Sequence, residues 1–215
     1  MNVVVDNLDT FLRGFGGTLT LLGLTTLFAL PFGLLLAAMR VSPVASLRAT
    51  SAVYVEVLRN TPLLLVFTFF SVIITYISGA LPFRTAAVLA LTIYTAPFFA
   101  EAIRSGINGV PVGQAEAARS IGMTFGQTLG LVILPQAVRS VVPPLINVII
   151  ALTKNTSVAG AFFIFEMFNV GREVANANGN AVIAVFLGVA FFYLIITVPL
   201  GQLADHIERR VAVRR

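Results

Sequence analysis

The sequence has no cysteine and a single histidine, His206. It therefore contains no disulfide, thiolate metal ligand or thiol nucleophile, and one histidine does not make a multi-histidine metal site. Charge is also scarce, because only 11% of the 215 residues are charged while 58% are hydrophobic. This composition is too apolar for a soluble core wrapped in a polar surface. The chain is predicted to be an all-α integral membrane protein.

The net charge of +5 does not indicate a nucleic-acid partner. The cations stand singly between long uncharged stretches, apart from one cluster at the C-terminus. Cations in this pattern are typical of topology signals at the ends of membrane spans, and the terminal cluster fits contact with anionic lipid.

Apolar stretches predict five membrane-spanning helices in one domain covering residues 1–215, without internal repeats or a soluble appendage. The first uncharged stretch, Gly14 to Met39, is long enough to cross about 30 Å of hydrocarbon. The five spans are expected at approximately residues 14–39, 58–78, 84–104, 136–155 and 178–203.

The basic residues predict which side of the membrane each loop faces, because short cytoplasmic loops collect Lys and Arg. An N-outside, C-inside arrangement leaves only Arg13, Arg84, Lys154 and Arg172 outside. It places the others inside, namely Arg40, Arg48, Arg59, Arg104, Arg119, Arg139, Arg209, Arg210, Arg214 and Arg215. Glu166, Arg172 and Glu173 are then expected to decorate an external loop.

The segment between the third and fourth spans, residues 106–125, is predicted to be cytoplasmic. Pro111 is suited to open a short helix that ends at Ser120, with Gly122 as its stop. Thr124 and Gln127 have the spacing of a capping box for the next helix. Small alanines beside charged residues favour docking of another protein, although an ordinary interfacial helix or loop has a similar composition.

Several residues in this region match a family signature. Glu116-Ala117-Ala118, then Gly122, then Val132-Ile133-Leu134-Pro135 resemble the EAA loop of ABC importer permeases, with Val132 where the family usually has isoleucine. Arg59-Asn60-Thr61-Pro62 looks like the Arg-x-Thr-Pro segment of the polar amino-acid branch. The matches extend over nearly the whole chain, and the sequences of the matching segments are most similar to those of glutamate-system permeases.

This resemblance implies a bacterial cytoplasmic-membrane transport subunit that is not itself an enzyme and binds no cofactor. The implied partners are two ATPase subunits that carry ATP and Mg²⁺, a second permease subunit that is either another copy of this chain or a homologue, an extracytoplasmic amino-acid-binding protein and membrane lipid. Consistently, the chain lacks a G-x-x-x-x-G-K-[ST] loop, because its one lysine, Lys154, follows Leu152-Thr153. The residues expected to couple it to the ATPase are Glu116, Ala117, Ala118, Arg119, Gly122 and Pro135.

Charges at membrane depth are candidates for substrate contacts, because each costs about 2.5 to 3.5 kcal/mol to insert. We expect Arg59 or Lys154 to bind a substrate carboxylate and Glu101 to meet its amine. Neutral contacts are expected from Asn60, Thr61, Asn155 and Thr156.

Each charge also has a simpler interpretation. Lys154 is placed to snorkel at a span end, Arg59 to mark topology and Glu101 to pair with Arg104 at i+3. A channel or an ion-gradient-driven secondary transporter is the alternative function, and it needs no docking loop.

Overall fold

The computed structural model describes residues 2–78 and 82–212, which are helical apart from short connections and contain no strand. The helices in chain order are α1 (Asn2–Asp6), α2 (Leu8–Arg40), α3 (Ala45–Arg59), α4 (Leu63–Thr68), η1 (Phe69–Ile74), α5 (Thr75–Ser78), α6 (Phe83–Asn108), α7 (Val112–Ser120), α8 (Phe125–Gln127), η2 (Thr128–Ile133), α9 (Leu134–Asn155), α10 (Ser157–Ala161), α11 (Met167–Ala177) and α12 (Val182–Ala212). The predicted all-α fold is confirmed.

Four helical stretches in the described part are long and apolar enough to cross a membrane: Leu8–Arg40, Phe83–Asn108, Phe125–Ala161 and Val182–Arg210. A fifth crossing results if α3 and the α4–η1 stretch, which meet at an angle of 100°, form one broken span. The helix predicted over residues 58–78 thus differs in detail. Its first residues close α3, and the helix that follows the break begins at Leu63.

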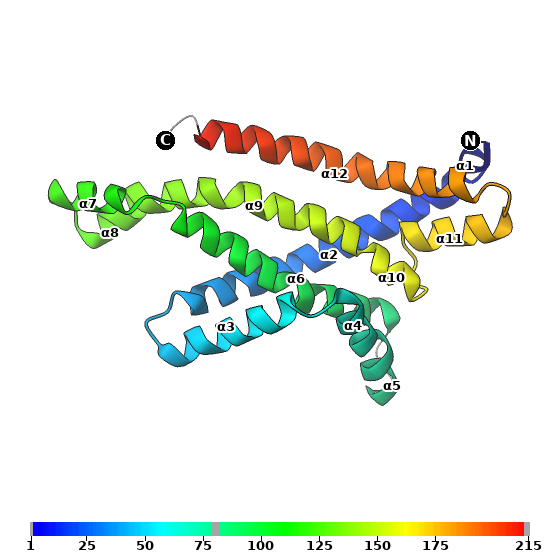
Figure 1. Cartoon of the computed structure of the whole chain (residues 1–215), viewed down its shortest axis with the longest axis horizontal. Coiled ribbons are helices and arrows are strands. Elements are labelled where there is room, and N and C mark those ends of the chain that lie inside the picture. Colours follow the sequence, from blue (N-terminus) through cyan, green and yellow to red (C-terminus); the bar gives the residue numbers. More distant parts are fainter. Residues whose placement is uncertain (1, 79–81, 213–215) are drawn as a thin grey trace.

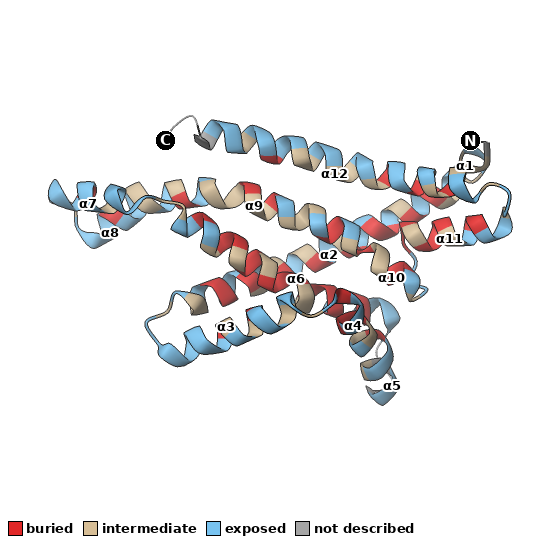
Figure 2. Ribbon diagram, in the orientation of Figure 1, coloured by how far each residue is buried: buried red, intermediate tan, exposed pale blue. Residues whose placement is uncertain are grey.

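Helix α6 lies at the centre of the fold. Its most apolar window is 72% buried, against 22% for the α9 stretch and 17% for α12, so those two helices leave most of their apolar surface outside the chain. Small residues on α6 and α2 permit this central packing. A Cβ added at Gly33 of α2 would lie 2.5 Å from the Phe99 Cβ and 2.8 Å from the Ala96 carbonyl oxygen of α6, so the two helices meet too closely for a side chain at position 33. Figure 2 shows the buried residues concentrated where α6 meets its neighbours.

The helices are arranged along one long axis (Figure 1). Helices α7 and α8 occupy one end, and α1 and α11 lie at the opposite end, from which α12 runs back along the molecule. Because α6 leads directly into α7, the exposed end segment is joined to the core by a continuous central helix. This connection places the two parts of the site described next.

Candidate functional site

The predicted docking segment forms a short helix, a tight turn and a second helix. Helix α7 follows Pro111 and ends at Ser120, as predicted. The turn is a Schellman motif, in which the Met123 amide donates to the Ala118 carbonyl and the Gly122 amide donates to the Arg119 carbonyl. The next helix opens with the predicted capping box between Thr124 and Gln127.

Gly122 is required by its backbone conformation. Its φ is +87°, in the left-handed region that side chains disfavour. A Cβ at this position would meet nothing within 4 Å, so crowding by neighbouring atoms does not require glycine here. The turn keeps glycine because of backbone strain alone.

Helix α7 divides the predicted coupling residues into an inner and an outer set. Ala118 is buried, whereas Glu116, Ala117 and Arg119 are exposed, and α7 as a whole packs against η2. No ion pair within 4.0 Å joins Glu116 to Arg119, two residues that the structure describes, so both charges remain available to a partner. Pro135 is also exposed, in the first turn of α9.

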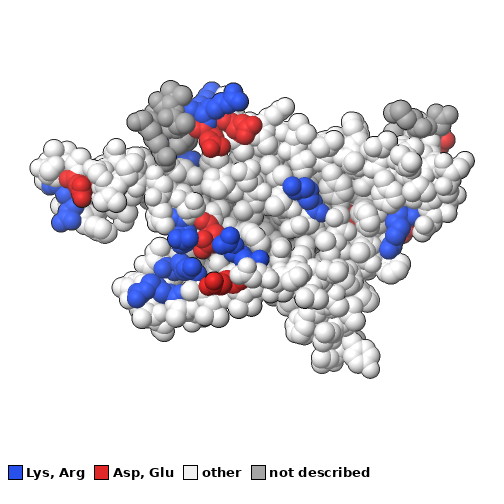
Figure 3. All heavy atoms as spheres, viewed as in Figure 1, with Lys and Arg blue, Asp and Glu red and all other residues white. Residues whose placement is uncertain are grey.

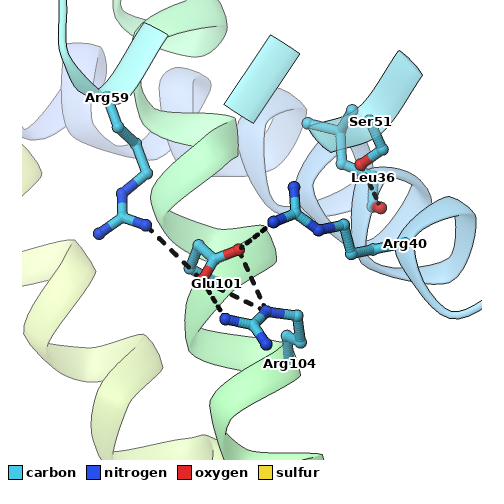
Figure 4. A network of polar contacts seen from close by, with 6 residues as sticks. All are labelled: Leu36, Arg40, Ser51, Arg59, Glu101 and Arg104. Carbon is cyan, nitrogen blue, oxygen red and sulfur yellow. Dashed lines mark hydrogen bonds and ion pairs between the residues drawn. The ribbon is translucent and has the colours of Figure 1, made fainter. Parts of the chain in front are cut away.

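A second polar feature lies inside the fold, where the carboxylate of Glu101 meets three arginines from three helices (Figure 4). Arg104 of α6 donates to it from Nε at 3.2 Å and from Nη2 at 2.7 Å. Arg59 of α3 and Arg40 of α2 approach it at 3.6 and 3.9 Å. The expected pairing of Glu101 with Arg104 is confirmed, and Arg40 is an addition that sequence analysis assigned only to topology.

Local contacts hold these three helices in place around Glu101. The Ser51 hydroxyl of α3 donates to the Leu36 carbonyl of α2 at 2.8 Å, one turn before Arg40. The Tyr54 hydroxyl donates to the Ile93 carbonyl of α6 at 3.0 Å. These two hydrogen bonds therefore hold helix α3 against both α2 and α6.

A cavity of about 390 Å³ opens beside this cluster. It is lined by Arg40, Val55, Glu56, Arg59, Asn60, Phe98, Glu101 and Arg104. Its charged atoms appear in Figure 3 as a mixed blue and red group between α3 and α6, whereas most of the remaining face is uncharged.

One guanidinium nitrogen of Arg40, a residue that lines the cavity, lacks a partner. Nη1 of Arg40 is buried and forms no hydrogen bond with any residue in the described ranges. A buried donor without a partner costs free energy, so this nitrogen would gain from a hydrogen-bond acceptor if the Arg40 side chain moved.

The cavity adjoins the break between α3 and α4. Asn60 and Thr61 close α3 through hydrogen bonds from their side chains to the carbonyls of Glu56 and Val57, both at 2.8 Å. Pro62 then precedes the first residue of α4. Interrupted apolar helices of this kind mark substrate sites in many transporters, because freed backbone groups are tolerated only where they line a cavity.

The structure gathers only some of the predicted substrate residues. Arg59, Asn60 and Glu101 line the cavity, and Thr61 is outside its lining. The remaining predicted residues lie at the end of α9, away from the cavity, namely Lys154, Asn155 and Thr156. Lys154 is exposed, whereas the buried Thr156 hydroxyl donates to the Thr153 carbonyl at 2.7 Å.

The sequence-based prediction did not include five of the lining residues, namely Arg40, Val55, Glu56, Phe98 and Arg104. The usable signal was the spacing of Glu56, Arg59 and Asn60, which share one helical face at i, i+3 and i+4. That signal is visible only if residues 45–59 are recognised as a helix of their own.

The prediction that Glu166 is an exposed loop residue is wrong, because its side chain is fully buried. It caps α11 by accepting hydrogen bonds from the amides of Phe168 and Asn169, at 2.9 and 2.7 Å. The hydroxyls of Tyr193 and Thr18 also donate to it, at 2.8 and 3.5 Å. Glu166 therefore joins α2, α11 and α12.

Comparison with known proteins matches this chain and its fold to transport permeases. The family model described as "Binding-protein-dependent transport system inner membrane component" matches residues 29–213. The chain is 39% identical to the glutamate transport system permease protein GluC of Corynebacterium glutamicum, over 96% of both chains. It is 36% identical to the probable glutamine ABC transporter permease protein GlnM of Bacillus subtilis, over 98% of this chain and 97% of the relative.

A solved structure of an amino acid ABC transporter with histidines superposes with a TM-score of 0.88, at 29% identity and over 96% of both chains. These matches favour an ABC importer subunit over the alternative function, an ion-gradient-driven transporter or channel. The chain belongs to the family of inner-membrane components of binding-protein-dependent transport systems, and it is a permease subunit of an ABC importer for amino acids.

Proposed function

We propose that this subunit carries glutamate across the bacterial cytoplasmic membrane by alternating access. The observation that carries the proposal is the cavity beside Glu101, whose charged lining consists of three arginines and two glutamates. Its net positive charge suits an amino acid with a net negative charge, and charge-assisted hydrogen bonds from guanidinium groups are strong carboxylate contacts.

The cavity and the docking segment are mechanically connected. Glu101 and Arg104 lie in the last turns of α6, and the same chain continues through Pro111 into α7. Movement of α7 by an ATPase would therefore shift Glu101 and Arg104 relative to Arg40 and Arg59, which belong to other helices. This shift is the step that opens the cavity to one side and closes it to the other.

The coupling contacts are assigned to the exposed face of α7 and the turn after it, namely Glu116, Ala117, Arg119 and Gly122, and to Pro135 in the first turn of α9. Ala118 is the buried residue of α7, and α7 packs against η2. Two ATPase subunits bind ATP and Mg²⁺, so this chain needs no nucleotide site of its own. Lys154, Asn155 and Thr156, toward the end of α9 that the proposed orientation places outside, remain assigned to an earlier substrate contact on the import path.

The assembly is completed by a second permease subunit and by an extracytoplasmic binding protein that delivers the amino acid. In the proposed orientation, the N-terminus is outside and α7 faces the cytoplasm. Because α7 and the start of α2 lie at opposite ends of the long axis, this orientation places the docking segment and the N-terminal end on different sides of the membrane (Figure 1).

Reconstitution tests this proposal. The chain is placed in proteoliposomes with its ATPase and binding-protein partners, and ATP hydrolysis and labelled amino-acid uptake are measured with glutamate, glutamine and lysine in turn. Glutamate is expected to stimulate both activities, glutamine less, and lysine not at all. Stimulation by lysine equal to that by glutamate would contradict the assignment of the cavity to an acidic substrate.

A further inference from the structure

The geometry around Glu101 makes this carboxylate a poor acceptor for a substrate amine. Three guanidinium groups lie within 2.7 to 3.9 Å of its oxygens. An ammonium group brought to Glu101 would face all three positive charges at short range, and like charges repel strongly in a site with little water. The amine of an α-amino acid therefore needs a different partner.

Glu56 is the second carboxylate in the cavity wall, and it is not engaged. It lines the cavity, its side chain is exposed, and it has no ion pair or hydrogen bond to its carboxylate within residues 2–78 and 82–212. Glu56 belongs to α3, and if α3 and the α4–η1 stretch form one broken span, an ionisable side chain without a partner is costly there. One turn later the same face presents Arg59.

The charges that remain after Glu101 is paired match one class of ligand. Arg40, Arg59 and Arg104 carry three positive charges and Glu101 cancels one, so two are left for two carboxylates. Glu56 adds one negative charge for one ammonium group. An α-amino dicarboxylic acid has these three charges.

We propose that Glu56 is the specificity-determining residue that accepts the α-ammonium group of the substrate, while Glu101 serves to hold the three arginines in position. This inference rests on the proposed function of the cavity as a glutamate site. It moves the amine contact from Glu101, where the sequence placed it, to Glu56.

The test compares two ligands that differ in the amine. Glutarate has the same carbon skeleton and both carboxylates of glutamate but lacks the α-ammonium group. Binding of labelled glutamate, and its displacement by glutarate, are measured on the assembled importer in detergent without the binding protein. The wild type is expected to prefer glutamate at least tenfold, as one charge-assisted contact provides.

Glu56→Gln is expected to weaken glutamate binding about tenfold to hundredfold and to leave glutarate binding unchanged or tighter, so that the preference disappears. Glu208→Gln is the matched control, because it removes an exposed carboxylate near the end of α12 and should keep the preference. Glu56→Asp retains a carboxylate and should keep part of the preference for glutamate over glutarate. This variant provides the test if Glu56→Gln fails to assemble.

Two results separate the inference from the proposed function. If Glu56→Gln weakens both ligands equally, or neither, while the wild type binds glutamate, the role of Glu56 is refuted and the glutamate site stands. If the wild type binds neither ligand and glutamate does not stimulate ATP hydrolysis, the proposed function fails and the inference fails with it.

Discussion

At the scale of single residues, Glu101 and Glu166 show two ways of keeping a carboxylate inside an apolar fold. Glu101 is held by positive charge, and its side chain is 19% exposed beside arginines that are 29% to 45% exposed. Glu166 is fully buried and is held by four neutral donors. The first arrangement stays open to an incoming anion, whereas the second is saturated and serves structure.

Removing the Glu101 charge should destabilise the fold through its partners. Glu101→Gln leaves three arginines without a counterion, and we expect a loss of about 1 to 3 kcal/mol of unfolding free energy. Adding Arg104→Gln should recover part of this loss, because the second change removes one of the repelling charges. Thermal unfolding of the two single variants and the double variant in detergent measures the coupling, and strictly additive effects would show that the pair does not interact.

Glu166 should make stability depend on pH. It lies outside the candidate spans, and its burial raises its pKa above the ordinary 4.5, although hydrogen bonds from two amides and two hydroxyls oppose the shift. The folded chain therefore keeps this proton to higher pH than the unfolded chain. The stability that results is fully present below 4.5 and is lost as pH rises through the folded pKa.

The measurement is the difference in unfolding temperature between the wild type and Glu166→Gln across this pH range. The wild type should lose stability relative to the variant as pH rises, because only the wild type releases a proton there. If the unfolding temperature of the wild type minus that of Glu166→Gln stays constant or increases with pH, the pKa of Glu166 is not raised.

At the scale of elements, the turn after α7 is set by one backbone angle. Gly122 has a φ of +87°, whereas Gly126, four residues later in α8, has no positive φ, and both have open space around the Cβ position. Gly122→Ala should cost about 1 to 2 kcal/mol in the turn and lower the amount of glutamate transported per ATP hydrolysed. Gly126→Ala is the matched control and should slightly favour the helix. Equal transport-to-hydrolysis ratios in the two variants would argue against a coupling role for the turn.

Local chemistry made some elements predictable and left others hidden. Pro111, Gly122 and the spacing of Thr124 and Gln127 specify α7 and its turn within a few residues, so the sequence alone predicts this segment. The cavity depends on Arg40, Glu56 and Glu101, which come together only when α2, α3 and α6 pack. Likewise, the hydrogen bond from Thr18 to Glu166 joins residues 148 positions apart in the sequence, and no local sequence pattern predicts it.

At the scale of the whole molecule, the N-terminal end and the end that carries α7 lie at opposite ends of the long axis (Figure 1), and the proposed orientation places them on opposite sides of the membrane. The absence of cysteine makes this separation directly measurable, because any introduced thiol is the only one present. Asp6→Cys labels the N-terminal end, and Gly113→Cys and Glu208→Cys label α7 and the end of α12, all at exposed positions.

Intact bacterial cells that make each variant are treated with a membrane-impermeant maleimide. The N-outside, C-inside orientation rests on the excess of arginine in the loops assigned to the cytoplasm, and it predicts immediate labelling at position 6. Positions 113 and 208 should react only after the membrane is permeabilised. Labelling of position 113 in intact cells would place α7 on the outer face, where no ATPase can reach it, and the coupling mechanism proposed for Gly122 and the helix before it would have to be abandoned.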